Sequence, residues 1–380
     1  MTRTDATGTP LVPMRLGDIG EEPLVSVLVT NHNYGRFVGE ALESVLEQGY
    51  ERLEVIVCDD GSSDDSRDVV EGYATRDPRV RLIAKENGGQ ASAFNAAYAA
   101  SSGSLLCFLD ADDVFLPGKV DRVVRSFRRT PAGLLVHHMM IVDDVGRDLQ
   151  RIPTFTRFEH GWIAERVIER GGRWRWMPTS GVVLRREVAE RIFPVPEEPF
   201  RIDADMFLLE LAPLFAEVTT IDEVLGHYRL HGGNAYSRRK VDREGVERTI
   251  RSITTTIDQT NARLAELEID GVRPDPLRNL KLTEQRFLLA AFDGRVSRWR
   301  LARSYAGLAT SLIRDDLYGF PQKAWALLLY LGVVVLPASS REPWASASLG
   351  ISHGKELVRR VQQAAPRQLR GWLSGGGSRP

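Results

Sequence analysis

The first third of the chain alternates between short apolar runs and longer stretches in which apolar residues recur at helical spacing. Nearly continuous apolar runs of this length are typical of strands that are covered on both faces, as in a parallel sheet. The stretches between the runs predict helices over residues 36–49, 61–74 and 87–103. The predicted strands are residues 25–30, 53–58, 80–85, 104–109 and 134–142.

Strands that alternate with helices in this way predict a doubly wound α/β domain with a parallel sheet. In such sheets, ligands bind beyond the carboxyl ends of the strands. Three of the most polar clusters of the chain, 30-TNHN-33, 59-DDGSSDD-65 and 110-DADD-113, directly follow predicted strands. We therefore expect the ligand site where these three clusters meet.

Residues 110–113 place three carboxylates after an apolar strand, where their mutual repulsion is costly unless a cation lies among them. A polar turn in which an Asp caps the next helix would explain them as well. The sequence contains neither G-x-G-x-x-G after the first strand nor a G-x-x-x-x-G-K-[ST] loop to cradle phosphates. Carboxylates hold a diphosphate only through a divalent cation, and Mg²⁺ or Mn²⁺ commonly bridges the two. The cluster is therefore interpreted as half of a metal–diphosphate site.

Composition narrows the class of protein. The chain has 380 residues, which favours two domains, and its 43% hydrophobic content suffices for a packed core. A formal net charge of −1 argues against nucleic acid as the main partner. Cys58 and Cys107 lie inside apolar runs and predict buried thiols rather than a disulfide or a zinc site. Residues 1–23 contain no apolar signal-peptide core and predict a flexible N-terminus.

Seven blocks of the sequence, taken in order, resemble those of the inverting nucleotide-sugar glycosyltransferases of family 2. The resemblance covers residues 24–237 and implies a GT-A fold, with residues 24–130 as the nucleotide-binding half and residues 131–237 as the acceptor-binding half. Residues 238–380 would then form a mostly helical C-terminal region. The blocks are VSVLVTNHNYGRFVGEALESVLEQ, VIVCDDGSSDDS, NGGQASAFNAA, FLDADDVFLP, PTSGVVLRRE, IDADMFLLELA and LGHYRLHGGNAYS.

The resemblance implies a site for the nucleotide-sugar donor. Asp60 would accept a hydrogen bond from the uracil ring of a UDP-sugar, and Asp59 beside it would hold the turn. Thymine and guanine donors stay open, because thymine presents an edge similar to that of uracil. The full set of implied donor-binding residues is Thr30, His32, Asp60, Asn87 and Asp110.

The resemblance also implies a divalent cofactor, Mn²⁺ or Mg²⁺. Asp112 and His231 would be its protein ligands, with Asp113 nearby. Some relatives place a basic residue near the diphosphate in the segment that corresponds to residues 87–95, which contains none here. The charge of the diphosphate would then be met by the metal and by Arg229.

Asp203 would be the general base that removes the proton of the acceptor hydroxyl during a single inverting displacement. Many relatives have Glu before this Asp, whereas this chain has Ile202, which leaves Asp205 as a rival base. Asp203 could instead only cap the helix that begins at Ala204. The acceptor implied by the resemblance is a glycan or a lipid-linked molecule.

Two other functions stay open. Residues 105-LLCFLDADDV-114 also match the entry motif of haloacid-dehalogenase-like phosphatases, in which Asp110 would be the nucleophile and Asp112 the acid and base. A relative that binds nucleotide sugars without turnover is the second alternative. Trp174 and Trp176 are consistent both with a sugar-stacking surface and with core packing.

The C-terminal part of the chain has a different character. Residues 240–315 place apolar residues at helical spacing, and residues 324–338 carry no charge. This uncharged run is shorter than the ~20 residues of a membrane-spanning helix, so a buried helix, a re-entrant segment and an interfacial anchor stay open. Residues 355–372 are basic with interleaved apolar residues, which is typical of contact with an anionic membrane surface. We expect a cytoplasmic protein that rests peripherally on the inner face of the membrane.

Overall fold

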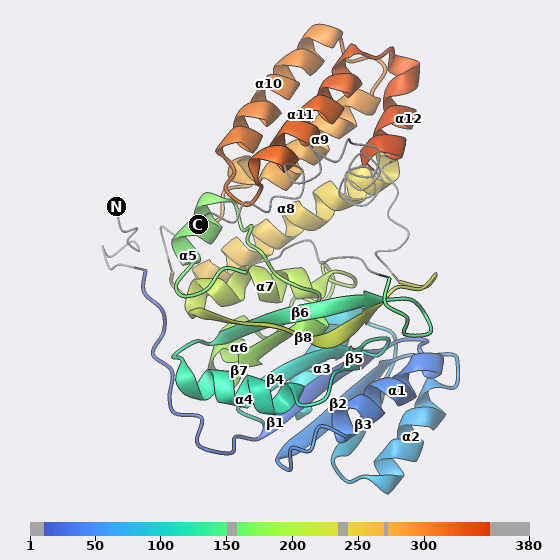
Figure 1. Ribbon diagram of the computed structural model, residues 1–380, viewed down its shortest axis with the longest axis vertical. Coiled ribbons are helices and arrows are strands. Elements are labelled where there is room, and N and C mark those ends of the chain that lie inside the picture. The colour runs from blue at the N-terminus through green and yellow to red at the C-terminus, as the bar shows by residue number, and fades with distance from the viewer. Residues whose placement is uncertain (1–10, 150–157, 235–241, 270–272, 350–380) are drawn as a thin grey trace, which may run out of the picture. The chain divides into compact units, whose positions relative to one another are not determined.

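The computed structural model describes residues 11–149, 158–234, 242–269 and 273–349, which divide between two compact units (Figure 1). The first unit comprises Met1–Gly232 and Thr255–Pro274, and the second comprises Gly233–Thr254 and Asp275–Pro380. The expected boundary near residue 237 lies close to the end of the first stretch. The second half of helix α8 (Arg243–Glu266), however, belongs to the first unit.

The strands of the described residues form one sheet in the order β3-β2-β1-β4-β7-β6-β8-β5. β1 pairs in parallel with β2 and β4, and β2 pairs in parallel with β3. β7 is antiparallel to both β4 and β6, so the expected acceptor half continues the sheet of the nucleotide-binding half. The strands are β1 (Val25–Asn31), β2 (Leu53–Asp60), β3 (Val80–Lys85), β4 (Leu105–Asp110), β5 (Val114–Phe115), β6 (Leu134–Val142), β7 (Val182–Arg185) and β8 (Val218–Arg229).

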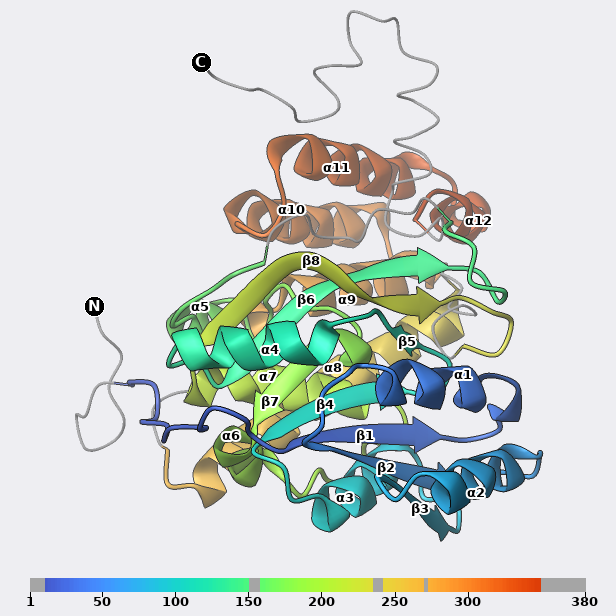
Figure 2. The ribbon, with the colours of Figure 1, turned by 60° about the horizontal axis from the view of Figure 1, so that its bottom comes forward.

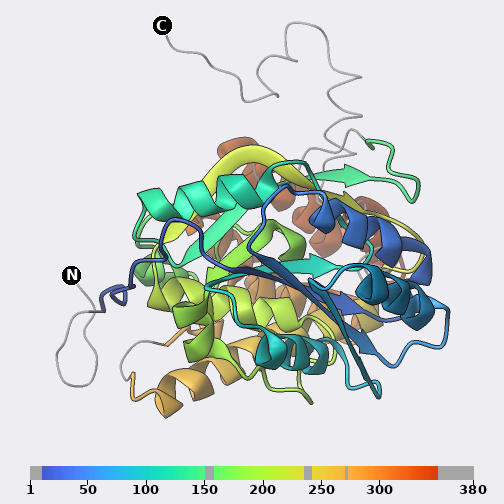
Figure 3. The same cartoon turned by 90° about the horizontal axis from the view of Figure 1, so that it is seen from below.

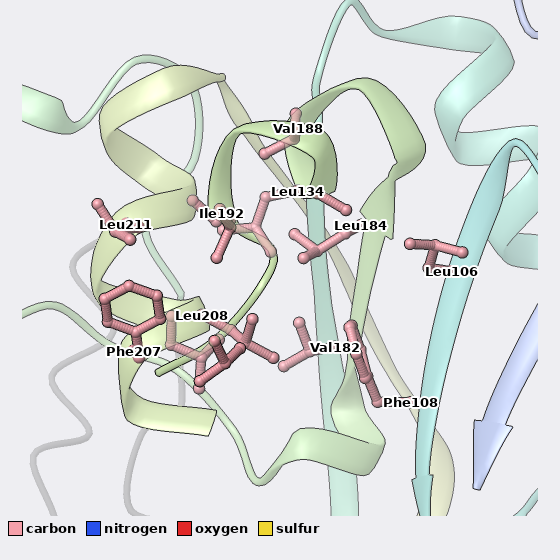
Figure 4. Close-up of a cluster of buried hydrophobic side chains, with 14 of the residues drawn as sticks. Leu106, Phe108, Leu134, Val182, Leu184, Val188, Ile192, Phe207, Leu208 and Leu211 are labelled. Carbon is pink, nitrogen blue, oxygen red and sulfur yellow. The ribbon is translucent and has the colours of Figure 1, made fainter. Parts of the chain in front are cut away.

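Helices cover both faces of the sheet, because the central strands are apolar on both sides. Val27 of β1 packs in one layer with α1, α2 and α4, whereas Leu28 packs with α3, α6 and α7 on the opposite face (Figures 2 and 3). Figure 4 shows part of the second layer, in which Leu184 of β7 lies among side chains of α6 and β6. The predicted α/β fold is therefore confirmed. The helices are α1 (Gly35–Leu46), α2 (Ser66–Arg76), α3 (Gln90–Ala100), α4 (Lys119–Arg129), α5 (Ala164–Glu169), α6 (Arg186–Ile192) and α7 (Ala204–Phe215), with a 3₁₀ turn η1 at Thr179–Gly181.

The described part of the N-terminal segment is held against the first unit. Met14 N donates to Phe215 O at 2.8 Å, and Gly17 N donates to Glu187 Oε1 at 2.7 Å. The flexibility expected of residues 1–23 therefore does not hold for this part, because its backbone is hydrogen-bonded to two helical segments. The first ten residues lie outside the described part of the chain.

Two tryptophans and both cysteines of the first unit pack in or against its core. Trp174 is 3% exposed and donates from Nε1 to Leu209 O at 2.7 Å, so core packing describes it better than sugar stacking. Trp176 is partly buried against the same core. Cys58 and Cys107 are buried free thiols, as predicted.

The second unit is helical, as predicted from residues 240–315. Its core contains Phe287 of α9, Leu308 of α10, and Tyr330 and Val333 of α11. Among the described residues, no helix is both long enough and apolar enough to cross a membrane. Residues 355–372, for which we expect membrane contact, lie outside the described residues. The elements after α8 are η2 (Pro276–Arg278), α9 (Leu280–Phe292), α10 (Arg298–Arg314), α11 (Phe320–Val335) and α12 (Ala338–Leu349).

Candidate active site at the carboxyl ends of the parallel strands

The three polar clusters meet at one edge of the sheet. β1 lies between β2 and β4, and the register aligns Thr30 with Asp110 and Asn31 with Asp59. The Thr30 hydroxyl donates to Asp110 Oδ1 at 3.3 Å, and Asn31 Nδ2 donates to Asp59 Oδ2 at 2.8 Å. The expected convergence of the clusters is confirmed, because parallel strands in register end at the same edge.

Asp59 holds the turn after β2. Its Oδ1 accepts hydrogen bonds from Ser62 N at 3.0 Å and from Arg67 Nε at 2.8 Å. Burial alone would raise the pKa of Asp59, but the hydrogen bonds from Ser62, Arg67 and Asn31 lower it below its ordinary value. Asp59 is therefore an ionised, fully engaged carboxylate that fixes the position of its neighbour Asp60.

Asp60 is 4% exposed, and its carboxylate already accepts hydrogen bonds from three donors. Oδ1 accepts from Lys85 Nζ at 2.8 Å and from Gly88 N at 2.9 Å, and Oδ2 accepts from Gly89 N at 2.7 Å. A carboxylate offers about four lone-pair positions, so a nucleobase would use the one that is left on Oδ2. Lys85 is a cation at the site that the sequence reasoning missed. The parallel register that places Lys85 beside Asp60 was the signal for it.

His32 and Asn87 are exposed and lie next to the backbone of Asp60, at the rim of this site. His32 Nδ1 lies 2.9 Å from Asp60 O, and Asn87 Nδ2 donates to Asp60 O at 3.1 Å. Arg201 Nη2 donates to Asn87 Oδ1 at 2.7 Å, which brings a second cation to this rim. The structure thus joins three of the predicted donor-binding residues, Asp60, His32 and Asn87, to a side chain from beyond residue 200.

Arg201 reaches the rim because the loop before α3 is fastened to the segment before α7. Gln90 N donates to Arg201 O at 2.9 Å. Gly89 has φ +90°, and a Cβ there would come within 2.6 Å of Arg201 Cα. Only glycine adopts this conformation easily and permits this approach. The sequence does contain the Gly88-Gly89 pair, but nothing in it identifies the partner segment.

The second half of the site is a cluster of carboxylates. Burial raises the pKa of Asp110 to about 8, and repulsion from Asp112 and Asp205 adds to the shift. Burial and the neighbouring carboxylates likewise raise the pKa of Asp113 well above its ordinary value. Asp113 Oδ2 is buried without a hydrogen-bond partner. Because these carboxylates repel one another when ionised, a cation bound among them would be stabilised and would favour their ionised form.

His231 and Asp112 are brought into direct contact. His231 Nε2 lies 2.9 Å from Asp112 Oδ2, although 119 positions separate them in the chain. The imidazole ring lies edge-on to Tyr34, with ring centroids 5.5 Å apart, and 4.8 Å from the ring of Phe37. The two residues predicted as metal ligands therefore contact each other, and the imidazole ring packs against two aromatic side chains.

These residues fit a metal site that the substrate completes, and not a site made of protein ligands alone. No three His, Cys, Asp or Glu side chains within the described residues are arranged to hold a metal ion by themselves. Asp112 and His231 offer one oxygen and one nitrogen ligand beside the buried carboxyl group of Asp113. Mg²⁺ and Mn²⁺ are often held by one or two protein ligands together with substrate phosphates, and the site fits that arrangement.

Arg229 has a different role from the one expected. Its residue is 3% exposed, its Nε donates to Asp112 O at 2.9 Å, and its backbone N donates to Asp113 Oδ1 at 3.0 Å. Nη2 pairs with Glu40 Oε2 at 2.7 Å. The guanidinium group therefore stabilises the turn that carries the carboxylates, whereas Lys85 and Arg201 are the cations nearer the rim.

Asp203 stands at the start of α7 with φ +66°, which residues other than glycine adopt rarely. Its side chain makes no capping hydrogen bond, and Ala204 N donates instead to Gln90 Oε1 at 2.9 Å. Asp203 thus occupies the N-cap position of α7 without the side-chain hydrogen bond that a capping role would supply. Asp205, the second residue of α7, lies close enough to Asp110 to raise the pKa of Asp110, so Asp203 and Asp205 both remain candidate bases.

A buried lysine supports the carboxylate cluster from behind. Lys119 Nζ donates to Ser180 O at 2.7 Å and lies 3.3 Å from the centroid of the Phe115 ring. Ser180 Oγ in turn accepts from Asp110 N at 3.0 Å. Burial lowers the pKa of Lys119 to about 7. These contacts account for the PTSG segment, whose role the sequence did not reveal.

Comparisons with known proteins give the relatives of this chain. The family model described as Glycosyl transferase family 2 matches residues 26–193. An uncharacterized glycosyltransferase of Nostoc sp. (strain PCC 7120) is 31% identical over 309 residues, which are 81% of this chain and 94% of that protein. The hyaluronan synthase of Pasteurella multocida is 36% identical over 117 residues, which are 31% of this chain and only 12% of the synthase.

The fold is also found among solved structures. TarS residues 1–349 of S. aureus, in complex with UDP-GlcNAc, superposes with a TM-score of 0.52 over 86% of this chain and 91% of that one. The sequence identity is 17%, so this likeness concerns the fold. Together with the family match, it confirms the expected GT-A fold.

Proposed function

The chain belongs to the family 2 glycosyl transferases, and from this premise we propose that it moves a sugar from a nucleoside-diphosphate donor to an acceptor hydroxyl with inversion at the anomeric carbon. The convergence of the strand ends carries the proposal, with Thr30 3.3 Å from Asp110 and His231 2.9 Å from Asp112. The phosphatase alternative is not favoured, because its motif would follow the first strand of the chain, whereas Asp110 ends β4.

The proposed donor is a UDP-sugar. Asp60 accepts a hydrogen bond from the base, and the ribose and the sugar would follow toward Thr30 and Asp110, which end neighbouring strands at the same edge of the sheet. His32 and Asn87 line the rim of the base pocket. Support comes from the burial of Asp60 beside the exposed His32 and Asn87, and from two cations, Lys85 on Asp60 and Arg201 on Asn87.

Asp112 and His231 are the proposed protein ligands of Mn²⁺ or Mg²⁺. A cation bound there neutralises the charge that develops on the leaving diphosphate. The excess of buried carboxylates and the unpartnered Asp113 Oδ2 support a positive ligand at this point. Lys119 and Arg229 stabilise the turn but do not replace that cation. Lys119 donates to the backbone carbonyl oxygen of Ser180, and Arg229 donates to that of Asp112.

Asp203 is the proposed general base. As the acceptor oxygen attacks the anomeric carbon, Asp203 takes its proton and the bond to the diphosphate breaks on the opposite side, which inverts the centre. A positioned carboxylate contributes roughly 10²–10⁴-fold to such a step. The left-handed backbone of Asp203 supports a functional role, because strained conformations of non-glycine residues cluster at active sites.

The proposed acceptor is a glycan or a lipid-linked molecule. The match to part of a hyaluronan synthase supports polysaccharide synthesis as the setting. Nothing in the site selects a particular sugar.

A panel of UDP-, GDP- and dTDP-sugars, scored by thermal shift and by release of the nucleoside diphosphate, tests the proposal. In Mn²⁺ we expect at least one UDP-sugar to raise the melting temperature and to be slowly hydrolysed, and EDTA should abolish both effects. Asp112→Asn is the matched control and should lose the metal-dependent part. Absence of any nucleotide-sugar response in Mn²⁺ would contradict the proposal, as would hydrolysis of p-nitrophenyl phosphate that Asp110→Asn abolishes.

A further inference from the structure

Helix α11 is apolar on the face that the second unit buries and also on the face that it exposes. Tyr330 and Val333 are buried in the core of the unit, where α11 packs against α10 and α12 (Figure 2). At about 100° per residue, the exposed positions fall within an arc of about 80° on the other side of the helix. These four residues, which we term the α11 face, are Phe320 (76% exposed), Leu328 (60%), Leu331 (41%) and Val335 (60%).

Exposed apolar side chains are concentrated in this part of the molecule. Seven of the twelve large apolar residues that are exposed in the described part of the chain lie between residues 299 and 344. Residues 324–338 contain no charged residue that would interrupt the apolar α11 face. Single exposed apolar residues are ordinary, but a contiguous apolar face on one helix marks a binding surface.

One cationic side chain lies beside this surface, and a second is exposed at the end of the preceding helix. Lys323 donates from Nζ to Ile313 O at 2.9 Å and lines a shallow pocket together with Ile313, Phe320 and Leu327. Arg314 is exposed at the end of α10, although the exposed Asp316 lies near it. Over residues 295–349, which contain this surface, the sequence has seven Lys and Arg against three Asp and Glu, whereas the whole chain has a net charge of −1.

We propose that the α11 face docks on an anionic lipid surface, with its apolar side chains in the headgroup–acyl boundary and the neighbouring cations on the headgroup phosphates. An interfacial helix needs both an apolar stripe and flanking basic residues, and this unit supplies both. A second copy of the chain is the less suitable occupant, because two equally basic units would repel each other. Trp344, which is 38% exposed and donates from Nε1 to Leu329 O, adds an aromatic side chain of the kind found at membrane interfaces.

The test is flotation of the full-length protein with vesicles of phosphatidylcholine, with and without phosphatidylglycerol, at low and at high salt. We expect binding to the anionic vesicles at low salt and much weaker binding to phosphatidylcholine alone. The double variant L328Q/V335Q should bind at least about tenfold more weakly, because two half-exposed apolar side chains are removed from the lipid. L277Q is the matched control, since Leu277 is 77% exposed in the same unit but lies outside the α11 face, and it should bind as the wild type does.

Thermal melts must first show that the variants are folded, which is expected because the substituted side chains are exposed. Wild-type protein that stays off anionic vesicles at low salt overturns the proposal. Unchanged binding of L328Q/V335Q also overturns it, by assigning the contact to other basic segments. A wild-type dimer in light scattering that L328Q/V335Q dissociates, without vesicle binding, would assign the α11 face to self-association instead. The assay needs no turnover, so its outcome is independent of the proposed glycosyl transfer.

Discussion

Replacing Asp60 by alanine should weaken UDP binding while leaving the protein folded. The substitution removes the carboxylate that binds Lys85 Nζ, Gly88 N and Gly89 N, and with it the proposed acceptor for the base. A hydrogen bond to a charged group is worth about 1.5–3 kcal/mol. Since each 1.4 kcal/mol corresponds to tenfold in affinity, we expect the Kd for UDP to rise about 10- to 100-fold.

Titration calorimetry with UDP in Mn²⁺ measures this change, and a thermal melt checks the fold. Lys85→Met is the matched control, because it removes the ion-pair partner of Asp60 but leaves the carboxylate in place. Lys85 binds Oδ1 of Asp60, whereas the position left for the base is on Oδ2, so the affinity should fall much less than in Asp60→Ala.

Two results would refute this reasoning. Unchanged UDP affinity in folded Asp60→Ala protein would reduce Asp60 to a turn residue. A loss in Lys85→Met as large as that in Asp60→Ala would mean that Asp60 acts only by holding residues 88–89, and the base contact would have to be sought at His32 or Asn87.

Three further predictions concern catalysis and stability. Asp203→Asn should lower kcat by about 10²–10⁴-fold with UDP affinity nearly unchanged, whereas Asp205→Asn should cost less; the reverse order in steady-state kinetics would move the base to Asp205. Burial raises the pKa of Glu210 from 4.5 to about 8, so the folded state retains a proton that the unfolded state has released, and stability is lost as pH rises through that window. Glu210→Gln should therefore stabilise the protein by about 3 kcal/mol more at pH 9 than at pH 5 in denaturant melts, and an equal effect at both pH values would contradict the assigned burial. A chain that ends at Ser237 should be less stable than one that ends at Pro274 by at least about 2 kcal/mol, because only the longer chain keeps Leu264 in the first core; equal melting temperatures would show that this helix is dispensable.

The parts of the site that the sequence predicts are those in which a local pattern determines position. Thr30 and Asp110 end parallel apolar strands, so their meeting follows from strand order and register alone. The same logic applies to Lys85, which ends β3 and is aligned with Asp60 by the parallel register.

Other parts depend on contacts that no local pattern encodes. Arg201 reaches Asn87 only because the loop at Gly89 packs against a segment more than a hundred residues away. The burial of Arg229 and its pairing with Glu40 likewise depend on how β8 meets α1. A charged side chain that could bind a ligand may thus be paired within the fold instead. The sequence pattern does not distinguish a charge that is paired in this way from one that faces the ligand.

The role of the carboxylates at residues 110–113 is the central claim, and titration of the wild-type protein with UDP in Mn²⁺ and in EDTA tests it most directly. Because residues 110–113 carry carboxylates and no positive charge of their own to meet a diphosphate, we expect measurable binding in Mn²⁺ that is at least about tenfold weaker in EDTA. Equal affinity in the two buffers would contradict it, because the diphosphate would then be held without a cation at Asp112.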